Sequence, residues 1–530
     1  MNRGFLAIVL HAHLPYVRHP EYPEFLEEDW LYEAITETYL PLLEVFENCV
    51  NDGVPFRITL TLTPPLVGML RDELLMARYA QRLDSLCELC DKEVHRTRGD
   101  AQFGPLAWHY REHLYHLRRL FHDRWRRDLV AAFKRLQDAG ALEIMTCGAT
   151  HGFLPLMIHP EAVRAQIQVA CAHYRMHFGR HPRGIWLPEC GYSPGIDKYL
   201  AAENLRFFFV DSHALANAVP RPRRGVYAPI YTPSGVAAFA RDPESSMQVW
   251  SAEHGYPGDP IYREFYRDIG WDLDYDYVRP YIQATGDRKN TGIKYYRITG
   301  NVPLGSKQPY DPAAARERAD VHAGNFLFNR TRQIDFLRNA FGDGPPPIVV
   351  SPYDAELYGH WWYEGPVFLD RLIRRAVDQN VLKLASPIDY LADYPEQQLA
   401  QPPMSSWGAG GYAAVWLDEG NDWIYRYLHK ATERMIELSR LHPDAPDVAR
   451  RALNQAAREL LLAQSSDWAF IIKTGTMVDY AVRRTREHLL RFDKLYQQIK
   501  GGQVDEAWLS MVESRDNLFP EIDYRVYRPA

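Results

Sequence analysis

The chain has 530 residues, a formal net charge of −7 and a pI near 6.3. This mild acidity argues against nucleic acid or an anionic membrane as a partner, because both require a basic surface. With 46% hydrophobic and 24% charged residues, the chain is long and apolar enough to bury a large core. The aromatic content of 13% is high, and aromatic side chains either fill cores or contact ligands.

The compartment follows from the cysteines and from the apolar runs. Six irregularly spaced cysteines do not form a disulfide framework. The apolar run at residues 5–10 is shorter than the core of a signal peptide, and no stretch reaches the ~18 apolar residues of a membrane span. We therefore expect a cytoplasmic protein.

Short apolar segments alternate with helical patterns along the first 400 residues. The apolar segments are continuous rather than alternating, which is typical of parallel strands buried on both faces. Helical patterns between them predict βα units. The predicted strands are 5–13, 56–65, 141–151, 184–191, 207–213, 347–356 and 382–389, and the predicted helices include 29–50, 160–178, 195–204 and 366–380.

Polar residues follow most of these strands, among them His11, His151, Glu189, Asp211 and Asp354. In a (β/α) barrel the active site is built from the carboxyl ends of several strands. A doubly wound sheet would instead carry a glycine-rich first turn, which is missing after the first predicted strand. We therefore predict an irregular barrel of the α/β class over residues 1–400.

Two insertions and a tail complete the predicted organisation. Residues 66–140 are charged and helical, and we expect the Arg- and His-rich part to be a solvated face. Residues 214–346 are expected to form long loops over the barrel mouth, with a strand at 294–299. A Pro/Gly/Ser-rich linker at 394–411 precedes helical patterns at 421–440, 446–464 and 475–499, which predict a helical domain over 401–530.

Glu189 and Asp354 are the first candidate for chemistry. Each ends a predicted buried strand, so the two carboxylates can face each other across the barrel mouth. Two carboxyl groups that flank a bond are what glycoside chemistry needs, one as nucleophile or base and one as proton donor.

His11 and His13 allow a rival of a different class. An HxH pair at the end of a first barrel strand can hold a metal, and His151, His213 and Asp354 could complete an amidohydrolase-like set. No regular order of further histidines supports this set. We favour the interpretation without a metal, in which these histidines bind a polar substrate.

Tryptophans in loops suggest the kind of substrate. Trp361 follows Asp354, Trp271 lies in the second insertion, and Trp407 and Trp416 lie in the linker region. Sugar rings stack their apolar faces on aromatic planes, while their hydroxyls bond to polar side chains. We therefore expect these tryptophans to contact a carbohydrate.

Five segments together resemble glycoside hydrolase family 57, and in particular its 1,4-α-glucan branching enzymes. The resemblance runs from about residue 5 to about residue 500. Its most specific parts are the segments WLPECGY and SPYDAELYGHWWYEG, taken together. The five segments are HAHLPY (11–16), CGATHGFLPL (147–156), WLPECGY (186–192), SPYDAELYGHWWYEG (351–365) and SSDW (465–468).

The resemblance implies an incomplete (β/α)7 TIM-like barrel with a helical insertion, a C-terminal all-α domain, and neither a catalytic metal nor a cofactor. It implies a retaining double displacement on α-1,4-glucan, with Glu189 as nucleophile and Asp354 as acid/base. The other residues it implies are His11, His13, His151 and Asp467 at the donor subsite, and Trp271, Trp407 and Trp416 as stacking platforms.

Several outcomes share this pair of carboxylates. Branching, 4-α-glucanotransfer and α-amylase hydrolysis differ only in the acceptor, and a non-catalytic glucan-binding protein is a further alternative. Branching requires shielding from water, for which the segment 230–275 is the predicted lid. One departure from the family is Cys190, which stands where many members carry arginine after the nucleophile.

Overall fold

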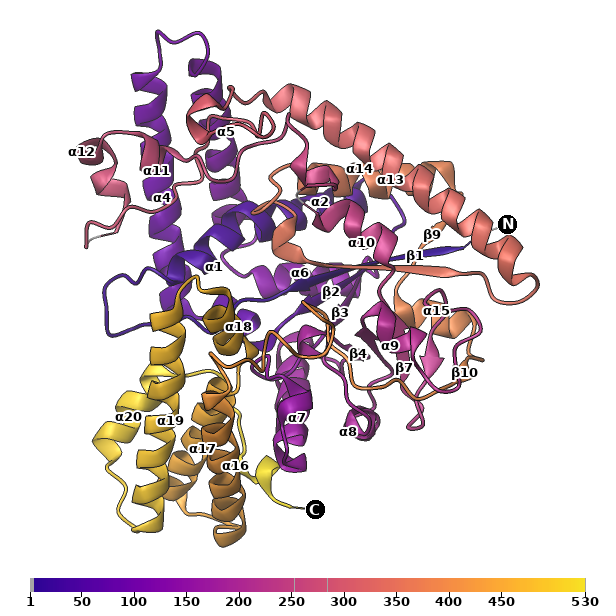
Figure 1. Ribbon diagram of the computed structural model, residues 1–530. Helices are drawn as coiled ribbons and strands as arrows, with labels where there is room; N and C mark the ends of the chain where they lie inside the picture. Colours follow the sequence, from indigo (N-terminus) through magenta and orange to yellow (C-terminus); the bar gives the residue numbers. More distant parts are fainter. Residues whose placement is uncertain (1–3, 252, 284, 530) are drawn as a thin grey trace.

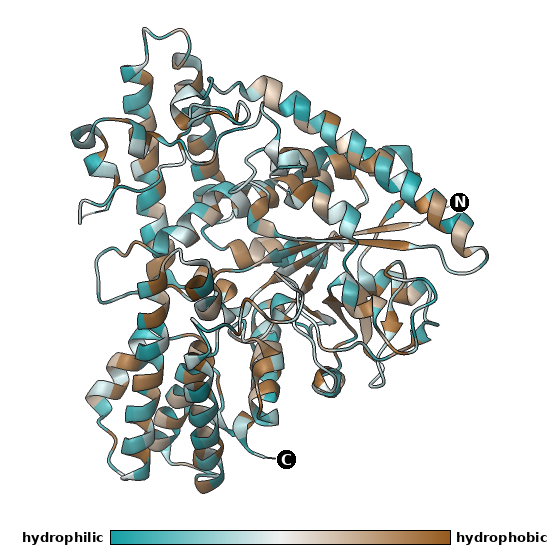
Figure 2. Ribbon diagram, in the orientation of Figure 1, coloured by the Kyte–Doolittle hydropathy of each residue, from teal (hydrophilic) through white to brown (hydrophobic). Residues whose placement is uncertain are grey.

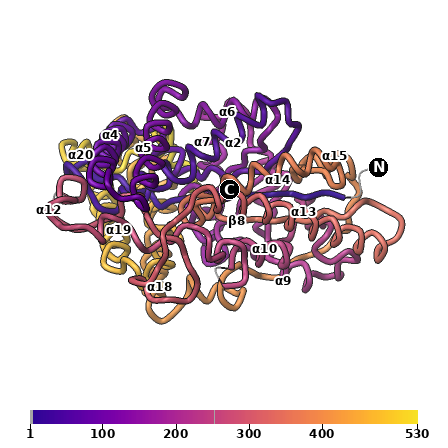
Figure 3. The backbone as a smooth tube through the Cα atoms, turned by 90° about the horizontal axis from the view of Figure 1, so that it is seen from above, coloured from indigo at the N-terminus to yellow at the C-terminus, as the bar shows by residue number. Residues whose placement is uncertain are grey.

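The computed structural model describes residues 4–251, 253–283 and 285–529. A barrel of parallel strands lies at the centre, with helices around it and a bundle of helices below it (Figure 1). The α4–α5 hairpin and the C-terminal helices lie on the same side of the barrel in both views (Figures 1 and 3). Among the described residues, no helix combines the length and the apolarity that crossing a membrane requires.

Seven strands of the described chain form the barrel. β1 pairs in parallel with β2 and with β8, β2 pairs with β3, β4 with β5, and β5 with β7. A bridge between Thr146 and Ile185 joins β3 to β4, and the Asp242 N–H donates to the Val350 carbonyl between β7 and β8 at 2.8 Å. The strands are β1 (Phe5–Ala12), β2 (Ile58–Leu62), β3 (Leu142–Met145), β4 (Gly184–Ile185), β5 (Phe207–Val210), β7 (Ala237–Ala240) and β8 (Ile348–Asp354).

The fold class predicted from the sequence is confirmed, but one of the seven predicted strands is only two residues long and is not one of the seven barrel strands. Residues 382–389 contribute only β9 (Lys383–Leu384), which pairs with the start of β1. The missing place is taken by β7, whose sequence AAFA is fully buried. Four residues, three of them alanine, carry too weak an apolar pattern to be recognised as a strand.

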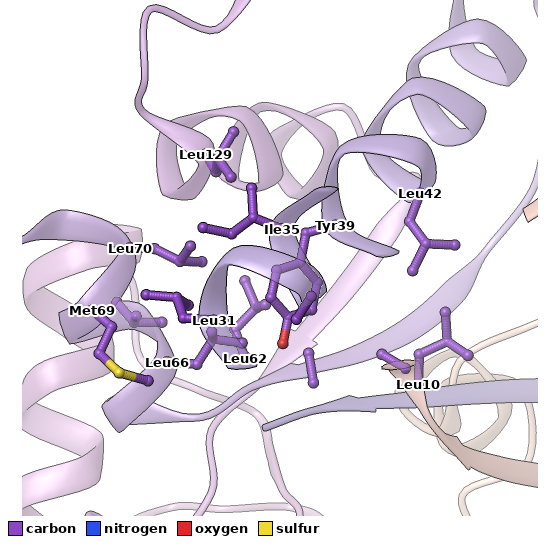
Figure 4. Packing of buried hydrophobic residues seen from close by; sticks show 14 of the residues in the cluster. Leu10, Leu31, Ile35, Tyr39, Leu42, Leu62, Leu66, Met69, Leu70 and Leu129 are labelled. Carbon is purple, nitrogen blue, oxygen red and sulfur yellow. The ribbon is translucent and has the colours of Figure 1, made fainter. Parts of the chain in front are cut away.

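Helices pack on the outside of the barrel. The predicted helix at 29–50 is present as α1 (Glu28–Ala34), a π-helical turn (Ile35–Tyr39) and α2 (Leu40–Asn51). Leu31 and Ile35 pack against Leu66 of α3 (Pro64–Arg71) and Leu129 of α6 (Leu129–Asp138) in one buried cluster (Figure 4). Truncating such a buried leucine to alanine typically costs about 2–5 kcal/mol, so this layer fixes the π-helical turn against the barrel.

The first insertion is a helical hairpin, made by α4 (Glu73–Arg96) and α5 (Gly104–Arg119) (Figure 1). Its Arg-rich stretch has one buried face, with Tyr110, Leu114 and Leu117. Its other face forms exposed ion pairs such as Arg111 with Asp91 and Arg118 with Asp84. The solvated face predicted for this stretch is therefore one side of α5, and the other side is buried.

The second insertion is more ordered than the predicted long loops. Besides β7 it holds β6 (Ile230–Tyr231), α10 (Pro243–Trp250) and the 30-residue helix α13 (Pro312–Phe341), which packs against α14 (Gly365–Gln379). The first part of the predicted lid, 230–250, therefore belongs to the barrel. The strand predicted at 294–299 is wrong, because these residues form only isolated bridges, Arg263 to Arg297 and Tyr296 to Pro309.

Other short elements connect these parts of the chain. Between β3 and β5 the chain forms α7 and α8. After α14 it forms α15, and β10 lies within the segment 394–411 that was predicted as a linker. The remaining elements are α7 (Pro160–Phe178), α8 (Ile196–Ala202), α9 (Ser212–Ala216), α11 (Ile269–Asp272), α12 (Tyr275–Val278), α15 (Pro387–Asp393) and β10 (Gln398–Leu399).

The C-terminal helices form a bundle beside the barrel. Figure 2 shows brown, apolar stripes alternating with teal, polar stripes along them, as expected for helices that bury one face. In α17, which corresponds to the helical pattern predicted at 446–464, Ala452, Leu453 and Leu460 are buried. The helices are α16 (Trp423–Leu441), α17 (Asp447–Ala463), α18 (Ser466–Thr474), α19 (Val478–Lys500) and α20 (Glu506–Arg515).

Candidate active site

A cavity of about 760 Å³ opens at the carboxyl ends of the barrel strands. β1, β7 and β8 bring residues to it, as do the turns after β3 and β4, the linker, and α18. Its lining includes most of the residues singled out in the sequence: His11, His13, His151, Glu189, Asp354, Trp361, Trp407, Trp416 and Asp467.

Strand register explains why two of these residues meet. His11 of β1 pairs with Asp354 of β8 on one side and with Thr61 of β2 on the other. Residues that pair between neighbouring parallel strands lie side by side, so His11 and Asp354 reach the same end of the barrel. The His11 ring is buried and stacks on Trp186, with centroids 4.7 Å apart.

Glu189 lies in a tight turn directly after β4 and has a left-handed backbone conformation, with φ 61°. Its Oε2 accepts a hydrogen bond from Trp407 Nε1 at 2.8 Å, and its Oε1 accepts one from Ser466 Oγ at 2.9 Å. Burial raises the pKa of Glu189 to about 7, although these two hydrogen bonds oppose the rise. The side chain is thus aimed by donors that favour its ionised form.

Asp354 ends β8, and its surroundings favour the protonated form. Burial raises the pKa of Asp354 well above its usual range, and the charges of Glu356 and Glu189 add to the rise, while Arg241 opposes it. One cavity therefore contains two carboxyl groups in different surroundings: two hydrogen-bond donors favour the ionised form of Glu189, whereas burial and two neighbouring carboxylates favour the protonated form of Asp354. Such a difference identifies acid and base roles in a pair of carboxylates.

A chain of hydrogen bonds leads from His11 to Glu189. His11 Nε2 lies 3.0 Å from His151 Nε2, and His151 Nδ1 lies 2.8 Å from Ser466 Oγ. Burial lowers the pKa of both imidazoles, so both are neutral. Because the Ser466 hydroxyl donates to Glu189, it accepts from His151, and His151 in turn accepts from His11.

His13 and Asp467 form an ion pair in the same cavity. His13 Nε2 lies 3.0 Å from both carboxylate oxygens of Asp467, and His13 Nδ1 lies 3.0 Å from Thr63 Oγ1. Burial alone would lower the pKa of His13, but Asp467 outweighs it and raises that pKa. Burial likewise works against ionisation of Asp467, yet His13 holds its pKa at about 2.

The predicted tryptophans occupy different places. Trp361 is 55% exposed at the rim and stacks on Phe265 at 4.4 Å, whereas Trp416 is buried and stacks on Phe153 at 5.0 Å. Trp271 lies on α11, is 54% exposed and donates to Asn290, and it is not part of the lining. The structure does not bring Trp271 to the other predicted residues.

Three residues to which the sequence assigned no role also belong here. Ser466 lies in the SSDW segment and Glu356 lies two residues after Asp354, so both motifs held a signal. The Glu356 carboxylate accepts hydrogen bonds from the Tyr39 hydroxyl and from the His13 N–H. Arg241 follows β7 and lines the cavity, and it escaped notice because the strand itself did.

Arg241 supplies a positive charge near Cys190, the position at which many family members carry arginine. The Cys190 side chain is buried in an apolar cluster with Trp186 and Phe209. Arg241 pairs with Asp211 at 2.7 Å and contributes a positive charge beside the carboxyl pair. A positive charge is thus present in the cavity, supplied by a different strand.

The five residues of the predicted metal site do not all lie together in the structure. His13, His151 and Asp467 do bring donor atoms within 4.8 Å of one another. Those atoms, however, bond to each other, to Ser466 and to His11. His213 lies on α9, where its ring bonds to the Gly411 carbonyl, so the predicted five-residue set does not assemble.

Comparison with known proteins gives a consistent result along the whole chain. The sequence pattern of glycosyl hydrolase family 57 matches residues 7–404, and that of the C-terminal part of 1,4-alpha-glucan branching enzymes matches residues 427–527. A 1,4-alpha-glucan branching enzyme of Thermococcus kodakarensis is 34% identical to this chain. The alignment covers 98% of this chain and 77% of the Thermococcus enzyme.

Solved structures agree closely in fold. The alpha-amylase AmyC from Thermotoga maritima is 49% identical, with a TM-score of 0.94 and complete coverage of both chains. A branching enzyme of the same family from Pyrococcus horikoshii is 32% identical, with a TM-score of 0.89 and coverage of 99% of this chain and 97% of its own. With its motifs and its fold in agreement with these relatives, the chain belongs to glycosyl hydrolase family 57.

Proposed function

We propose that this protein is a 1,4-α-glucan branching enzyme that acts by a retaining double displacement. The single observation that carries the proposal is that Glu189 and Asp354 line one cavity, where two hydrogen-bond donors favour ionised Glu189 and burial favours protonated Asp354. The relatives named as branching enzymes, and the match of residues 427–527 to the C-terminal part of such enzymes, support this substrate class.

The proposed first step breaks an α-1,4 bond. Asp354 donates its proton to the glycosidic oxygen, and ionised Glu189 attacks the anomeric carbon to form a covalent glycosyl intermediate. The donors Trp407 and Ser466 hold the Glu189 carboxylate in one orientation, so that little reorganisation is needed at the moment of attack.

The proposed second step forms the branch. The 6-hydroxyl of another glucan gives its proton to Asp354 and attacks the intermediate, which regenerates Glu189 and gives an α-1,6 bond. His11, His13, His151 and Asp467 would hold the donor sugar by hydrogen bonds. Trp361, Trp407 and Trp416 offer aromatic surfaces around the same cavity, and the exposed Trp361 is suited to the rim.

Hydrolysis of α-1,4-glucan is the second candidate function. A solved structure named as an alpha-amylase is 49% identical to this chain over its full length. If water reaches the intermediate before a sugar hydroxyl does, the same two carboxylates give a hydrolysed chain. Transfer to a 4-hydroxyl, as in a 4-α-glucanotransferase, would also use the same pair.

The experiment is incubation with amylose, followed by counting of α-1,6 linkages by NMR and of reducing ends in the intact product; enzymatic debranching of a separate portion then releases the transferred chains. Branching predicts new α-1,6 linkages with little rise in reducing ends, whereas hydrolysis predicts the reverse. Glu189→Gln and Asp354→Asn should each abolish turnover while the circular dichroism spectrum is unchanged. A folded variant of either residue that retains most of the activity would contradict the assignment.

A further inference from the structure

A second cavity, of about 730 Å³, lies on the C-terminal bundle between α16 and α19. We call it the α16–α19 groove. Its volume is similar to that of the candidate active site and falls within the ~300–1,000 Å³ of small-ligand sites. The role of this groove is not explained by the chemistry at Glu189 and Asp354.

The floor of the groove is apolar, and its walls are partly exposed. Ala431 and Phe492 are buried beneath it. Trp423 and Tyr427 of α16 form one wall, and Leu489 and Leu490 of α19 form the other. Tyr427 is 46% exposed and Leu490 is 69% exposed, so aromatic and aliphatic surface lies open to solvent at one place.

In the described part of the chain, the rim carries four cations, and two of them are paired with carboxylates. Arg434 pairs with Asp493 across the groove, and Lys430 pairs with Glu433 at 2.9 Å. Paired cations still offer N–H groups, but they attract an anion less strongly than free cations do. The other two cations, Arg426 and Arg486, lie over aromatic rings of the wall. The rim therefore offers N–H donors to a ligand that has many hydroxyl groups.

Two arginines hold the aromatic rings of the wall. The Arg486 guanidinium lies over the Trp423 ring, 5.6 Å from its centroid, and Arg426 lies 4.7 Å from the Tyr427 centroid. Arg426 also donates to the Tyr427 hydroxyl at 2.9 Å. Aromatic planes fixed in this way, beside polar donors, are the surface on which a sugar ring can stack and bond.

The groove adjoins the candidate active site through one layer of side chains. Trp423 and Leu489 pack against a buried cluster that contains Trp416 and Ala469. Trp416 lines the active-site cavity, as do Phe470 and Ile471 of α18. The two cavities therefore border the same buried cluster, which places the groove on the part of the bundle that packs at the active site.

We propose that the α16–α19 groove is a second glucan-binding site, which holds a distant part of the same α-1,4-glucan chain that enters the catalytic cavity. This proposal rests on the proposed function for its substrate class. Because binding at one site raises the effective concentration at the other, only chains long enough to span both sites gain affinity. The groove should therefore favour long chains over short ones.

The test compares Trp423→Ala and Tyr427→Ala with Trp108→Ala, a control tryptophan that is 51% exposed on α5. In the Glu189→Gln background, both groove variants should lose retardation in gels that contain amylose. In the active background, their KM for amylose should rise roughly fivefold or more, while kcat/KM for maltoheptaose stays within about twofold of the parent. Tyr427→Ala keeps the test valid if Trp423→Ala does not fold.

The outcomes separate this proposal from the proposed function. If both groove variants behave like Trp108→Ala, the groove proposal is overturned even though the enzyme branches amylose. If inorganic phosphate, rather than maltoheptaose, quenches the fluorescence that Trp423→Ala removes, the groove is an anion site and the proposal is also overturned. If the parent forms no glucan product but the groove variants still lose amylose retardation, the proposed function fails and the groove site stands.

Discussion

Ser466 donates a hydrogen bond to Glu189 across 277 positions of sequence, with 2.9 Å between Oγ and Oε1. Ser466 begins α18 in the C-terminal bundle, whereas Glu189 follows β4 of the barrel. The same hydroxyl accepts from His151, which is linked to His11. The bundle thus supplies a donor to the carboxylate that we propose as nucleophile.

Removing this hydroxyl should weaken the nucleophile. In Ser466→Ala we expect kcat to fall roughly tenfold, since a hydrogen bond to a charged group contributes about 1.5 kcal/mol or more. The matched control is Ser439→Ala, because Ser439 is buried on α16 and donates to the Ile436 carbonyl. Steady-state kinetics on amylose measures both variants, and an equal loss in the two would show that Ser466 is merely structural.

The pH profile should report the proposed pair. Activity requires ionised Glu189, whose raised pKa is about 7, and protonated Asp354, whose pKa lies well above its usual range. We therefore expect kcat/KM to rise with pH through about 7 and to fall at higher pH, with two apparent pKa values that belong to the coupled pair. A profile that is already flat from pH 5 to 7 would contradict this assignment.

Trp407→Phe should move the rising limb of that profile. The indole N–H lowers the pKa of Glu189, so its loss should shift the limb upward by on the order of one pH unit, the equivalent of about 1.4 kcal/mol. Trp361→Phe is the control, because Trp361 contacts Phe265 by stacking and lines the same cavity. The proposed role of Trp407 fails if both variants keep the parental limb.

The His13–Asp467 pair should stabilise the fold most between about pH 4 and 6.5. The raised pKa of His13 contributes below its unfolded value near 6.5 and is lost as pH rises through the folded value. The lowered pKa of Asp467 contributes above its unfolded value near 4 and is lost as pH falls towards about 2.

Breaking this pair should therefore cost stability at pH 6. We expect Asp467→Asn to lower the free energy of unfolding by roughly 2 kcal/mol, because His13 loses a hydrogen bond to a charged partner and burial then favours its neutral form. Asp447→Asn removes an exposed pair with Arg450 and should cost under about 1 kcal/mol. Urea unfolding of both variants decides the matter, and similar midpoints would refute the prediction.

Gly359 shows why the turn after Asp354 tolerates no side chain. Its φ is +119°, and a Cβ would lie 1.8 Å from the Glu37 carbonyl oxygen in the π-helical turn. Gly300 has a similar φ of +112° but open space around it. We expect Gly300→Ala to cost about 1–2 kcal/mol and Gly359→Ala clearly more, as a lower thermal midpoint or a loss of soluble protein. Equal losses would mean that backbone strain alone matters.

The sequence by itself determined the family, the fold class and the main chemical groups. Glu189 and Asp354 could be predicted because buried parallel strands bring their carboxyl ends to one edge, whatever the rest of the chain does. The alternation of apolar strands and amphipathic helices is likewise a local property that survives folding.

Only the tertiary structure decided which distant groups surround that pair. Arg241 depends on β7, whose four residues carry little apolar pattern, and Ser466 reaches Glu189 only because α18 packs at the barrel mouth. Trp271 and Trp416 look alike in sequence, yet one lies exposed on α11 and the other is buried against Phe153. Local patterns encode periodicity and burial, whereas contacts between segments hundreds of residues apart depend on how the whole chain packs.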